Sequence, residues 1–271
     1  MDLNEWELLS QLYPTDELLI NEIQMLGLRG FDDNHNWNDA TIPLHLQEIG
    51  AHFIENNHSL HHIIQTNTNT LKCLSSLSSM QKKALDIICS HSSKKDILLA
   101  LLMIIQGTAG TRKSLLINCI REMLIALAGS GPSPIMLLAP TCVAAFNIQA
   151  STIHSALHLP LKDLTPLEGN ALAKFQEELK HIRYILIDEM SFIGPKLLHQ
   201  VDQRLREAFP LKRNFPFGGC SIILVGDLGQ LPPVKDIPLY AGTSYGTALW
   251  NTFTTVITLD KIFRQQGQNS A

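Results

Sequence analysis

A glycine-rich segment, Gly107–Ser114, constrains the fold of this chain more than any other feature. Its sequence, Gly-Thr-Ala-Gly-Thr-Arg-Lys-Ser, follows an apolar run at Ile97–Ile105 and precedes a helix-like segment at Leu115–Ala128. A strand, a glycine-rich turn, a Lys-Ser pair and a helix in this order are typical of a phosphate-binding loop, whose backbone N–H groups bind phosphate oxygens. The pattern normally has glycine directly before the lysine, and this chain has Arg112 there.

The length and composition are those of a globular protein. A chain of 271 residues, 45% hydrophobic and 17% charged, can form one large α/β domain and a smaller element. The formal net charge of −4 gives the whole chain no attraction to nucleic acid or to an anionic membrane. Any contact with DNA is therefore expected from a local site.

Several features favour an intracellular protein. The five cysteines form no Cys-x-x-Cys pair, which favours buried, reduced thiols. The first residues, Met1–Glu7, are acidic and do not resemble a secretory signal, and no apolar run approaches the roughly 20 residues that span a bilayer. We expect an intracellular protein with no membrane contact.

Residues 1–74 differ in character from the rest of the chain. Short amphipathic patterns broken by proline and glycine predict a small helical segment, and the tract Thr66–Thr70 with the serines after Leu74 indicates a linker. His58, His61 and His62 lie close together in the sequence, but no cysteine or carboxylate set supports them as metal ligands. We expect a surface helix there and a domain boundary near residue 74.

Residues 75–271 repeat one pattern, an apolar run that ends abruptly in polar residues, followed by a helix-like stretch. Helices are expected at Ala171–His181 and Pro195–Phe209. This alternation predicts a P-loop α/β fold, a mostly parallel sheet flanked by helices, which binds its ligand at the carboxyl ends of the strands. Besides Ile97–Ile105, the runs expected as strands are Ile135–Ala139, Tyr184–Ile187, Ser221–Val225 and Val256–Leu259.

Three groups of residues at those strand ends point to nucleotide hydrolysis. Lys113 is expected to reach the β- and γ-phosphates of ATP, and the Ser114 hydroxyl to ligate Mg²⁺. Asp188 and Glu189 end an apolar strand. Asp188 is expected to hold Mg²⁺ through a water molecule, and Glu189 to orient and deprotonate the attacking water. The string Gly226–Val234 contains two prolines that fix a turn, which can hold Gln230 where the γ-phosphate would lie.

Taken together, these motifs and several others resemble those of a known protein family. The chain resembles the PIF (petite integration frequency) family of DNA helicases, and is especially similar to the helitron-type helicases of mobile elements. The matching residues are Gln81, Gly107–Ser114, Ala139–Asn147, Ser151–Ser155, Ile187–Ser191, Gly226–Val234 and Ile262–Gln265.

The resemblance carries expectations about function. Residues 75–271 would be the first RecA-like motor lobe of a 5′-to-3′ ATP-dependent helicase, with the second lobe absent from a truncated copy. The partners would be single-stranded DNA and DNA duplex junctions. The cellular roles would be DNA repair, recombination and telomere maintenance, in the nucleus or alternatively in the mitochondrion.

The resemblance also assigns residues. Gln81 would read the adenine edge, and Arg264 would reach the γ-phosphate as an arginine finger. Cys142 stands where the family usually has glycine. The residues implied in nucleotide binding are Gly107, Thr108, Ala109, Gly110, Thr111, Arg112, Lys113 and Ser114, and those implied in DNA binding are Pro140, Thr141, Thr152 and His154.

Arg112 leaves alternatives open. A side chain forced into the backbone conformation that glycine normally supplies costs on the order of 1–3 kcal/mol, and its guanidinium could bind phosphate unproductively. One alternative is therefore an ATP-binding remnant of a mobile-element helicase with weak or no turnover. A P-loop small-molecule kinase is another, although a kinase would not need the Gln230 string. Stimulation of hydrolysis by single-stranded DNA distinguishes a helicase from both.

Overall fold

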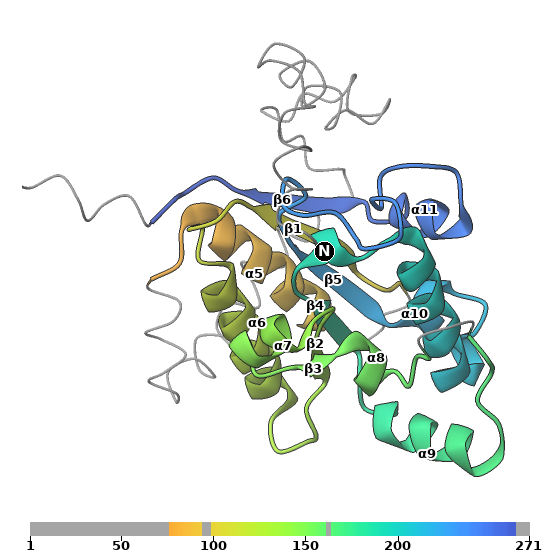
Figure 1. Ribbon diagram of the computed structural model, residues 1–271. Helices are drawn as coiled ribbons and strands as arrows, with labels where there is room; N and C mark the ends of the chain where they lie inside the picture. Colours follow the sequence, from red (N-terminus) through yellow and green to blue (C-terminus); the bar gives the residue numbers. More distant parts are fainter. Residues whose placement is uncertain (1–75, 94–98, 161–163, 264–271) are drawn as a thin grey trace, which may run out of the picture. The chain divides into compact units, whose positions relative to one another are not determined.

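The fold is a parallel sheet of six strands, described by a computed structural model for residues 76–93, 99–160 and 164–263 (Figure 1). The strand order is β3-β2-β4-β5-β1-β6, and every pairing is parallel. The predicted α/β fold with a parallel sheet is confirmed. The strands are β1 (Leu102–Gly107), β2 (Ile135–Ala139), β3 (Ser151–Thr152), β4 (Tyr184–Ile187), β5 (Ser221–Gly226) and β6 (Thr255–Leu259).

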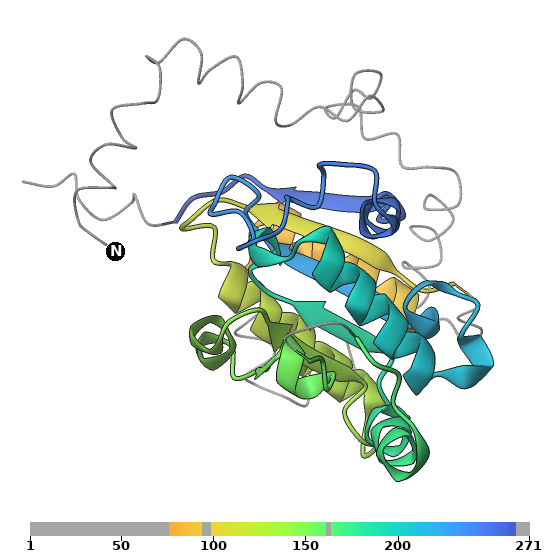
Figure 2. The same cartoon turned by 45° about the vertical axis from the view of Figure 1, so that its right-hand side comes forward.

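Helices cover both faces of this sheet (Figures 1 and 2). The main ones are α5 (Ser79–Ser93), α6 (Lys113–Ala128), α9 (Gly169–Leu179), α10 (Pro195–Ala208) and α11 (Tyr245–Trp250). Short elements complete the chain: α7 (Cys142–Asn147), α8 (Ile153–Ala156), and the 3-10 turns η2 (Met190–Phe192), η3 (Pro210–Lys212) and η4 (Pro216–Gly219).

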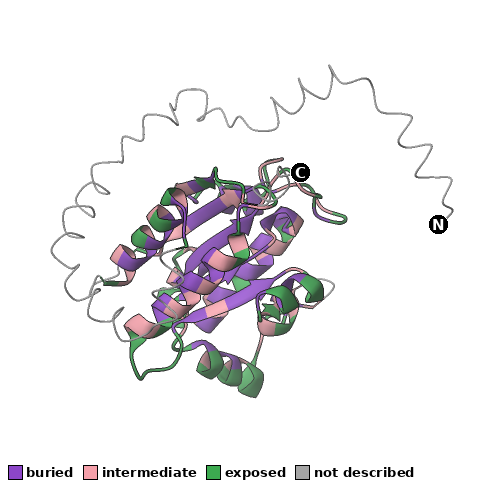
Figure 3. Ribbon diagram, turned by 90° about the vertical axis from the view of Figure 1, so that its left-hand side faces the viewer, coloured by how far each residue is buried: buried purple, intermediate pink, exposed green. Residues whose placement is uncertain are grey.

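Successive strand residues face two different cores. Met103 and Ile105 of β1 pack with α5 and α6, whereas Ile104 between them packs with α10 and α11 on the other face. Because side chains alternate along a strand, a sheet covered on both faces requires uninterrupted apolar strands. Figure 3 shows the buried strands between more exposed helices. The apolar runs found in the sequence therefore result from the cover of helices on both faces of the sheet.

Two strands, β2 and β4, have the predicted bounds, and β1 differs. Its predicted run began at Ile97, but the strand begins at Leu102, and Leu99 is 77% exposed. The neighbouring strand explains the difference. Leu102 pairs with Ile222 of β5, and the Leu101 carbonyl accepts the Ile222 N–H at 2.9 Å, so the ladder has no partner for Leu99. Apolar character alone overestimated the length of this strand.

Other predictions have mixed outcomes. Cys89 and Cys220 are buried, but Cys142 is exposed at the start of α7, contrary to the expectation of buried thiols.

Residues 1–74 with their histidines, and Arg264, lie outside the described residues, so the predictions for them stay untested. Among the described residues, no helix is long and apolar enough to cross a membrane.

Candidate active site

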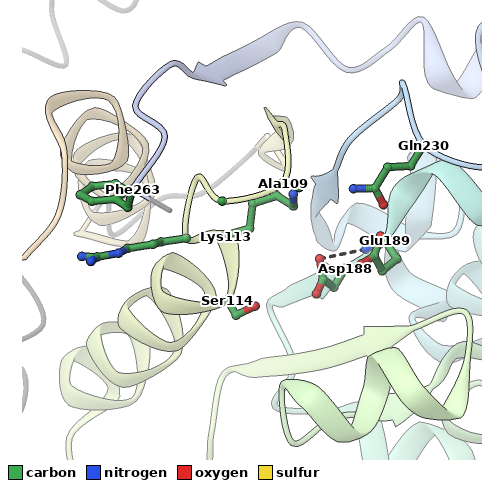
Figure 4. Close-up of a pocket in the computed structure, with 9 residues that line it drawn as sticks. Ala109, Lys113, Ser114, Asp188, Glu189, Gln230 and Phe263 are labelled. Atoms are coloured by element: carbon green, nitrogen blue, oxygen red, sulfur yellow. Dashed lines mark hydrogen bonds between the residues drawn. The ribbon is translucent and has the colours of Figure 1, made fainter. Parts of the chain in front are cut away.

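One pocket of about 390 Å³ lies at the carboxyl edge of the sheet (Figure 4). The phosphate loop follows β1, the Asp188–Glu189 pair follows β4, and Gln230 comes four residues after β5. These three strands are neighbours in the order β4-β5-β1, so their ends converge. The pocket is lined by Ala109, Gly110, Arg112, Lys113, Ser114, Asp188, Glu189, Gln230 and Phe263.

The backbone of the phosphate loop has the conformation expected of it. Arg112 precedes α6 in the left-handed region, with φ 57° and ψ 43°. A residue with a Cβ atom is unusual there, which is why glycine is the common choice. Gly107 allows a close approach of another kind, because a Cβ atom on it would lie 2.6 Å from Thr111 Oγ1 and 2.9 Å from Leu259 Cβ. The loop keeps glycine at Gly107, where space requires it, and at Gly110, where φ is 88°, but has an arginine at the left-handed position 112.

The side chain of Lys113 folds back into the phosphate loop that precedes it. Its Nζ donates to the Gly107 carbonyl at 2.7 Å and to the Thr108 carbonyl at 3.3 Å. The Thr111 hydroxyl also donates to Thr108, at 2.8 Å. An ammonium group has three donors, so it can bind a phosphate oxygen while keeping a backbone contact. The loop therefore presents a fixed positive charge at the helix N-terminus, where an anion is stabilised.

Gln81 supports the loop from behind and does not line the pocket. Its side chain is fully buried, and its Nε2 donates to the Thr111 carbonyl at 2.9 Å and to the Arg112 carbonyl at 3.3 Å. Its Oε1 accepts the Ser78 N–H at 2.8 Å. To read an adenine, as the resemblance implies, the amide would have to exchange these partners. Thr108, Thr111 and Gly107 are likewise not among the residues that line the pocket; Gly107 and Thr111 are buried, whereas Thr108 is exposed.

Asp188 and Glu189 combine burial with charge. Asp188 is 6% exposed, and its Oδ1 accepts the Glu189 N–H at 2.9 Å. Burial raises the pKa of Asp188 to about 6, the Glu189 charge adds to the rise, and the backbone hydrogen bond and Lys113 oppose it. Glu189 has φ 55°, and among the described residues its buried Oε2 has no hydrogen-bond partner. The site thus offers an acceptor oxygen directed at no protein donor.

The raised pKa of Asp188 has a consequence for stability. Because the folded chain holds this proton more tightly than the unfolded chain, ionisation of Asp188 costs stability as pH rises from about 4 to about 6, and the full cost remains above pH 6. Asp188→Asn is therefore expected to stabilise the ligand-free protein at pH 8 by about 2–3 kcal/mol, or about 4–10 °C in Tm. The gain should vanish near pH 4.

Thermal unfolding of both proteins in EDTA between pH 4 and pH 8 measures this difference. EDTA removes divalent cations, which would favour the ionised carboxylate. An Asp188→Asn gain of the same size at both ends of the range would contradict a raised pKa.

The four predicted DNA contacts come together at a neighbouring part of the same edge. Ala139 of β2 pairs with Thr152 of β3, which brings Pro140 and Thr141 beside Thr152 and His154. Thr141 Oγ1 accepts the Ala144 N–H at 3.2 Å, and Thr152 Oγ1 accepts the Ser155 N–H at 3.3 Å. Each threonine caps a short helix in this way, and its hydroxyl hydrogen is left to donate to an acceptor such as a phosphate oxygen.

The sequence did not predict two features of the site, an aromatic residue in the pocket and exposed apolar residues on α7. Phe263 lines the nucleotide pocket, although it drew attention only as the neighbour of Arg264 in a matching string. On α7, Val143 and Phe146 are 74% and 84% exposed beside the threonines, while Ala144 and Ala145 face the sheet. The signal for Phe146 was its place three residues after Val143 on the same helix face.

The charge of the chain is divided unevenly. Residues 76–271 hold 19 of the 21 lysine and arginine residues but only 14 of the 25 aspartate and glutamate residues. This part of the chain is therefore net positive, and the overall −4 comes from the acidic residues before it. The expectation that charge gives no attraction to nucleic acid holds for the whole sequence and not for the part that carries the site.

Comparison with known proteins decides the family. The sequence profile of the PIF1-like helicases matches residues 76–271. This range includes the whole pocket and the neighbouring group of Pro140, Thr141, Thr152 and His154, called the threonine cluster below. The chain belongs to the PIF1-like helicase family. The family predicted from the motifs is confirmed.

Among PIF1-like relatives, the ATP-dependent DNA helicase PIF1 of Candida albicans is 28% identical over 258 residues, 88% of this chain and 27% of the relative. PIF1 of Saccharomyces cerevisiae is 35% identical over 173 residues, 59% of this chain and 19% of the relative. The match covers only about a sixth to a third of the length of such curated relatives.

Solved structures of PIF1-like helicases share the fold. The Pif1 helicase of Candida albicans matches with a TM-score of 0.51 and 29% identity, over 70% of this chain and 41% of that structure. Pif1 from Bacteroides, in complex with ADP-AlF3 and ssDNA, matches with a TM-score of 0.50 and 26% identity, over 71% of this chain and 44% of that structure.

Proposed function

We propose that this chain supplies an ATP-hydrolysing motor lobe of a 5′-to-3′ DNA helicase. The observation that carries the proposal is the meeting of Lys113, Asp188, Glu189 and Gln230 in one pocket, beside a threonine cluster on the same sheet edge. The pocket provides a cation for phosphates, carboxylates for hydrolysis and an amide for orienting water. The family match supports the same function.

The residues of the pocket imply one orientation for bound ATP. Its terminal phosphates would lie against the N-terminus of α6, where Lys113 neutralises charge that develops during transfer. Glu189 would accept a proton from the attacking water, and Gln230 would orient that water. The buried Oε2 of Glu189, which has no hydrogen-bond partner in the described part of the chain, is a suitable acceptor for this proton.

The residues present also fit Mg²⁺. Ser114 and Asp188 supply oxygen ligands of the kind that Mg²⁺ prefers, and a magnesium ion in nucleotide sites usually takes one or two protein ligands besides phosphates and water. The described residues contain no group of three or more His, Cys, Asp or Glu side chains placed to hold a metal ion. When bound with ATP, Mg²⁺ would neutralise phosphate charge.

Single-stranded DNA is the proposed partner of the threonine cluster. Thr141, Thr152 and His154 can donate to backbone phosphates, which positions a strand without reading its sequence. Their place on the sheet edge that carries the nucleotide pocket supports coupling between hydrolysis and strand movement. We extend the proposal to duplex junctions, to repair, recombination and telomere maintenance, and to a nuclear location with the mitochondrion as alternative. These extensions rest on the family resemblance.

Arg112 favours a second candidate, an ATP-binding remnant without turnover. The backbone there keeps the left-handed conformation of a phosphate loop, so the departure from the pattern is the arginine side chain, which adds strain at the site of the phosphates. Both candidates bind nucleotide, and only the motor lobe hydrolyses ATP faster when DNA is present.

Steady-state ATP hydrolysis with and without single-stranded DNA tests the proposal. We expect hydrolysis that requires Mg²⁺ and increases severalfold with DNA. A chain that binds an ATP analogue but shows no hydrolysis with DNA would instead be the remnant. Hydrolysis unaffected by DNA would contradict the helicase assignment and favour a different P-loop enzyme.

A further inference from the structure

Three separate segments of the chain meet at Arg112. The backbone carbonyl of Arg112 accepts a hydrogen bond from Gln81 of α5 at 3.3 Å. The Arg112 guanidinium carbon lies 4.0 Å from the centroid of the Phe263 ring. The Phe263 N–H in turn donates to the Gly110 carbonyl of the phosphate loop at 3.0 Å. The segment that follows β6 is thus tied to the loop by one backbone hydrogen bond and one side-chain contact.

The contact between Arg112 and Phe263 is favourable by its geometry. A guanidinium within about 6 Å of an aromatic centroid is attracted by the negative face of the ring. Lys261 lies over the same ring, but its Nζ is 5.0 Å from the centroid, and it belongs to the segment itself. Among these two cations, Arg112 alone joins the ring to a different part of the fold.

Sheet topology brings this segment to the pocket. Strand β6 runs parallel to β1, and Leu259 pairs with Gly107, so the chain after Leu259 leaves at the edge where the phosphate loop begins. Phe263 then lines the nucleotide pocket on the side of Arg112 and Gly110, and Figure 4 shows it beside the loop and away from Glu189. The position of Phe263 therefore defines one wall of the pocket.

We propose that Arg112 is a positioning residue that holds the Asp260–Phe263 segment against the phosphate loop and so fixes this wall of the nucleotide pocket. The assignment of the pocket to nucleotide rests on the proposed function. An arginine at this position then has a role that glycine cannot perform. The strained conformation of Arg112 is offset in part by its contact with Phe263.

Hydrogen–deuterium exchange of the Phe263 amide tests the proposal in the protein without nucleotide or DNA. Arg112→Gln keeps a side chain with the same backbone strain but removes the cation. We expect the Phe263 amide to exchange about two- to thirtyfold faster in this variant, the range that a cation–π contact can produce. Arg112→Lys retains a cation and should restore part of the protection.

Two controls separate local positioning from a general loss of stability. The slowest amides of β4 report global unfolding and should exchange alike in wild type and Arg112→Gln. Lys261→Gln removes the other cation over the ring and should have the smaller effect. In a Phe263→Leu background, Arg112→Gln should cause no further increase, because the partner ring is already gone.

Unchanged exchange at Phe263 in Arg112→Gln, or an equal effect of Lys261→Gln, would overturn the proposal. An ATP analogue distinguishes this failure from a failure of the proposed function. If Arg112 positions Phe263 and nucleotide binds in this pocket, Arg112→Gln should weaken the affinity for the ATP analogue. Arg112→Lys should then have an affinity between those of Arg112→Gln and the wild type. Altered Phe263 exchange with no nucleotide binding in wild type would leave Arg112 as a positioning residue and remove the nucleotide assignment.

Discussion

Replacing Lys113 with alanine is expected to abolish the thermal stabilisation that MgATP, or a non-hydrolysable analogue with Mg²⁺, gives the wild-type chain. A ligand at about a hundred times its dissociation constant adds about 2.7 kcal/mol to the free energy of unfolding, which raises Tm by about 5–10 °C for a domain of this size. Lys113 is the cation that the structure places inside the phosphate loop, at 2.7 Å from the Gly107 carbonyl. Without it, the terminal phosphates lose their main charge partner, and the shift should fall below detection.

A lysine elsewhere on the surface provides the matched control. Lys174 of α9 has a side chain that is 77% exposed and forms an ion pair with Glu178, and it does not line the pocket. Lys174→Ala removes the same chemical group and should leave the nucleotide-dependent shift intact. Equal shifts in wild type and Lys113→Ala would show that nucleotide binds at another place.

The strands that carry the site were predictable because of how the sheet is covered. With helices on both faces, each strand needs apolar side chains at every position, and the polar residue that ends the run marks the strand end. Tyr184–Ile187 followed by Asp188 is an example, and both bounds agree with the structure. Parallel strands place such ends along one edge, so the convergence of the phosphate loop with Asp188 and Gln230 follows from sequence.

Contacts between distant segments were not predictable in this way. Gln81 was expected at the adenine, but its amide contacts the carbonyls of Thr111 and Arg112, which depends on how α5 packs behind the loop. Phe263 reaches the pocket because β6 lies next to β1, and the apolar pattern of β6 carries no information about its neighbour. The two-residue strand β3 is too short for any periodic signal, although it aligns Thr152 with Ala139.

Replacing Glu189 with glutamine is expected to lower the rate of ATP hydrolysis by roughly 10²–10⁴-fold, the usual contribution of a general base. The substitution keeps the shape of the side chain and removes only its ability to accept a proton. Both residues carry a Cβ atom, so the left-handed backbone at φ 55° is equally strained before and after the change. Nucleotide affinity should survive, because Glu189 is expected to act on the attacking water and not on the phosphates.

The comparison with Asp188→Asn makes this prediction specific to a base. Asp188 is a proposed Mg²⁺ ligand, so Asp188→Asn should weaken binding of the Mg²⁺–nucleotide complex and also lower the rate of hydrolysis. Glu189→Gln should lower the rate of hydrolysis and leave the binding unchanged. Glu178→Gln on α9, in an exposed ion pair with Lys174, serves as the control and should change neither quantity. Titration with an ATP analogue and measurement of phosphate release on the same preparations distinguish the cases. Unimpaired turnover in Glu189→Gln would remove this carboxylate from the mechanism, and the buried Oε2 without a hydrogen-bond partner among the described residues would then need another explanation.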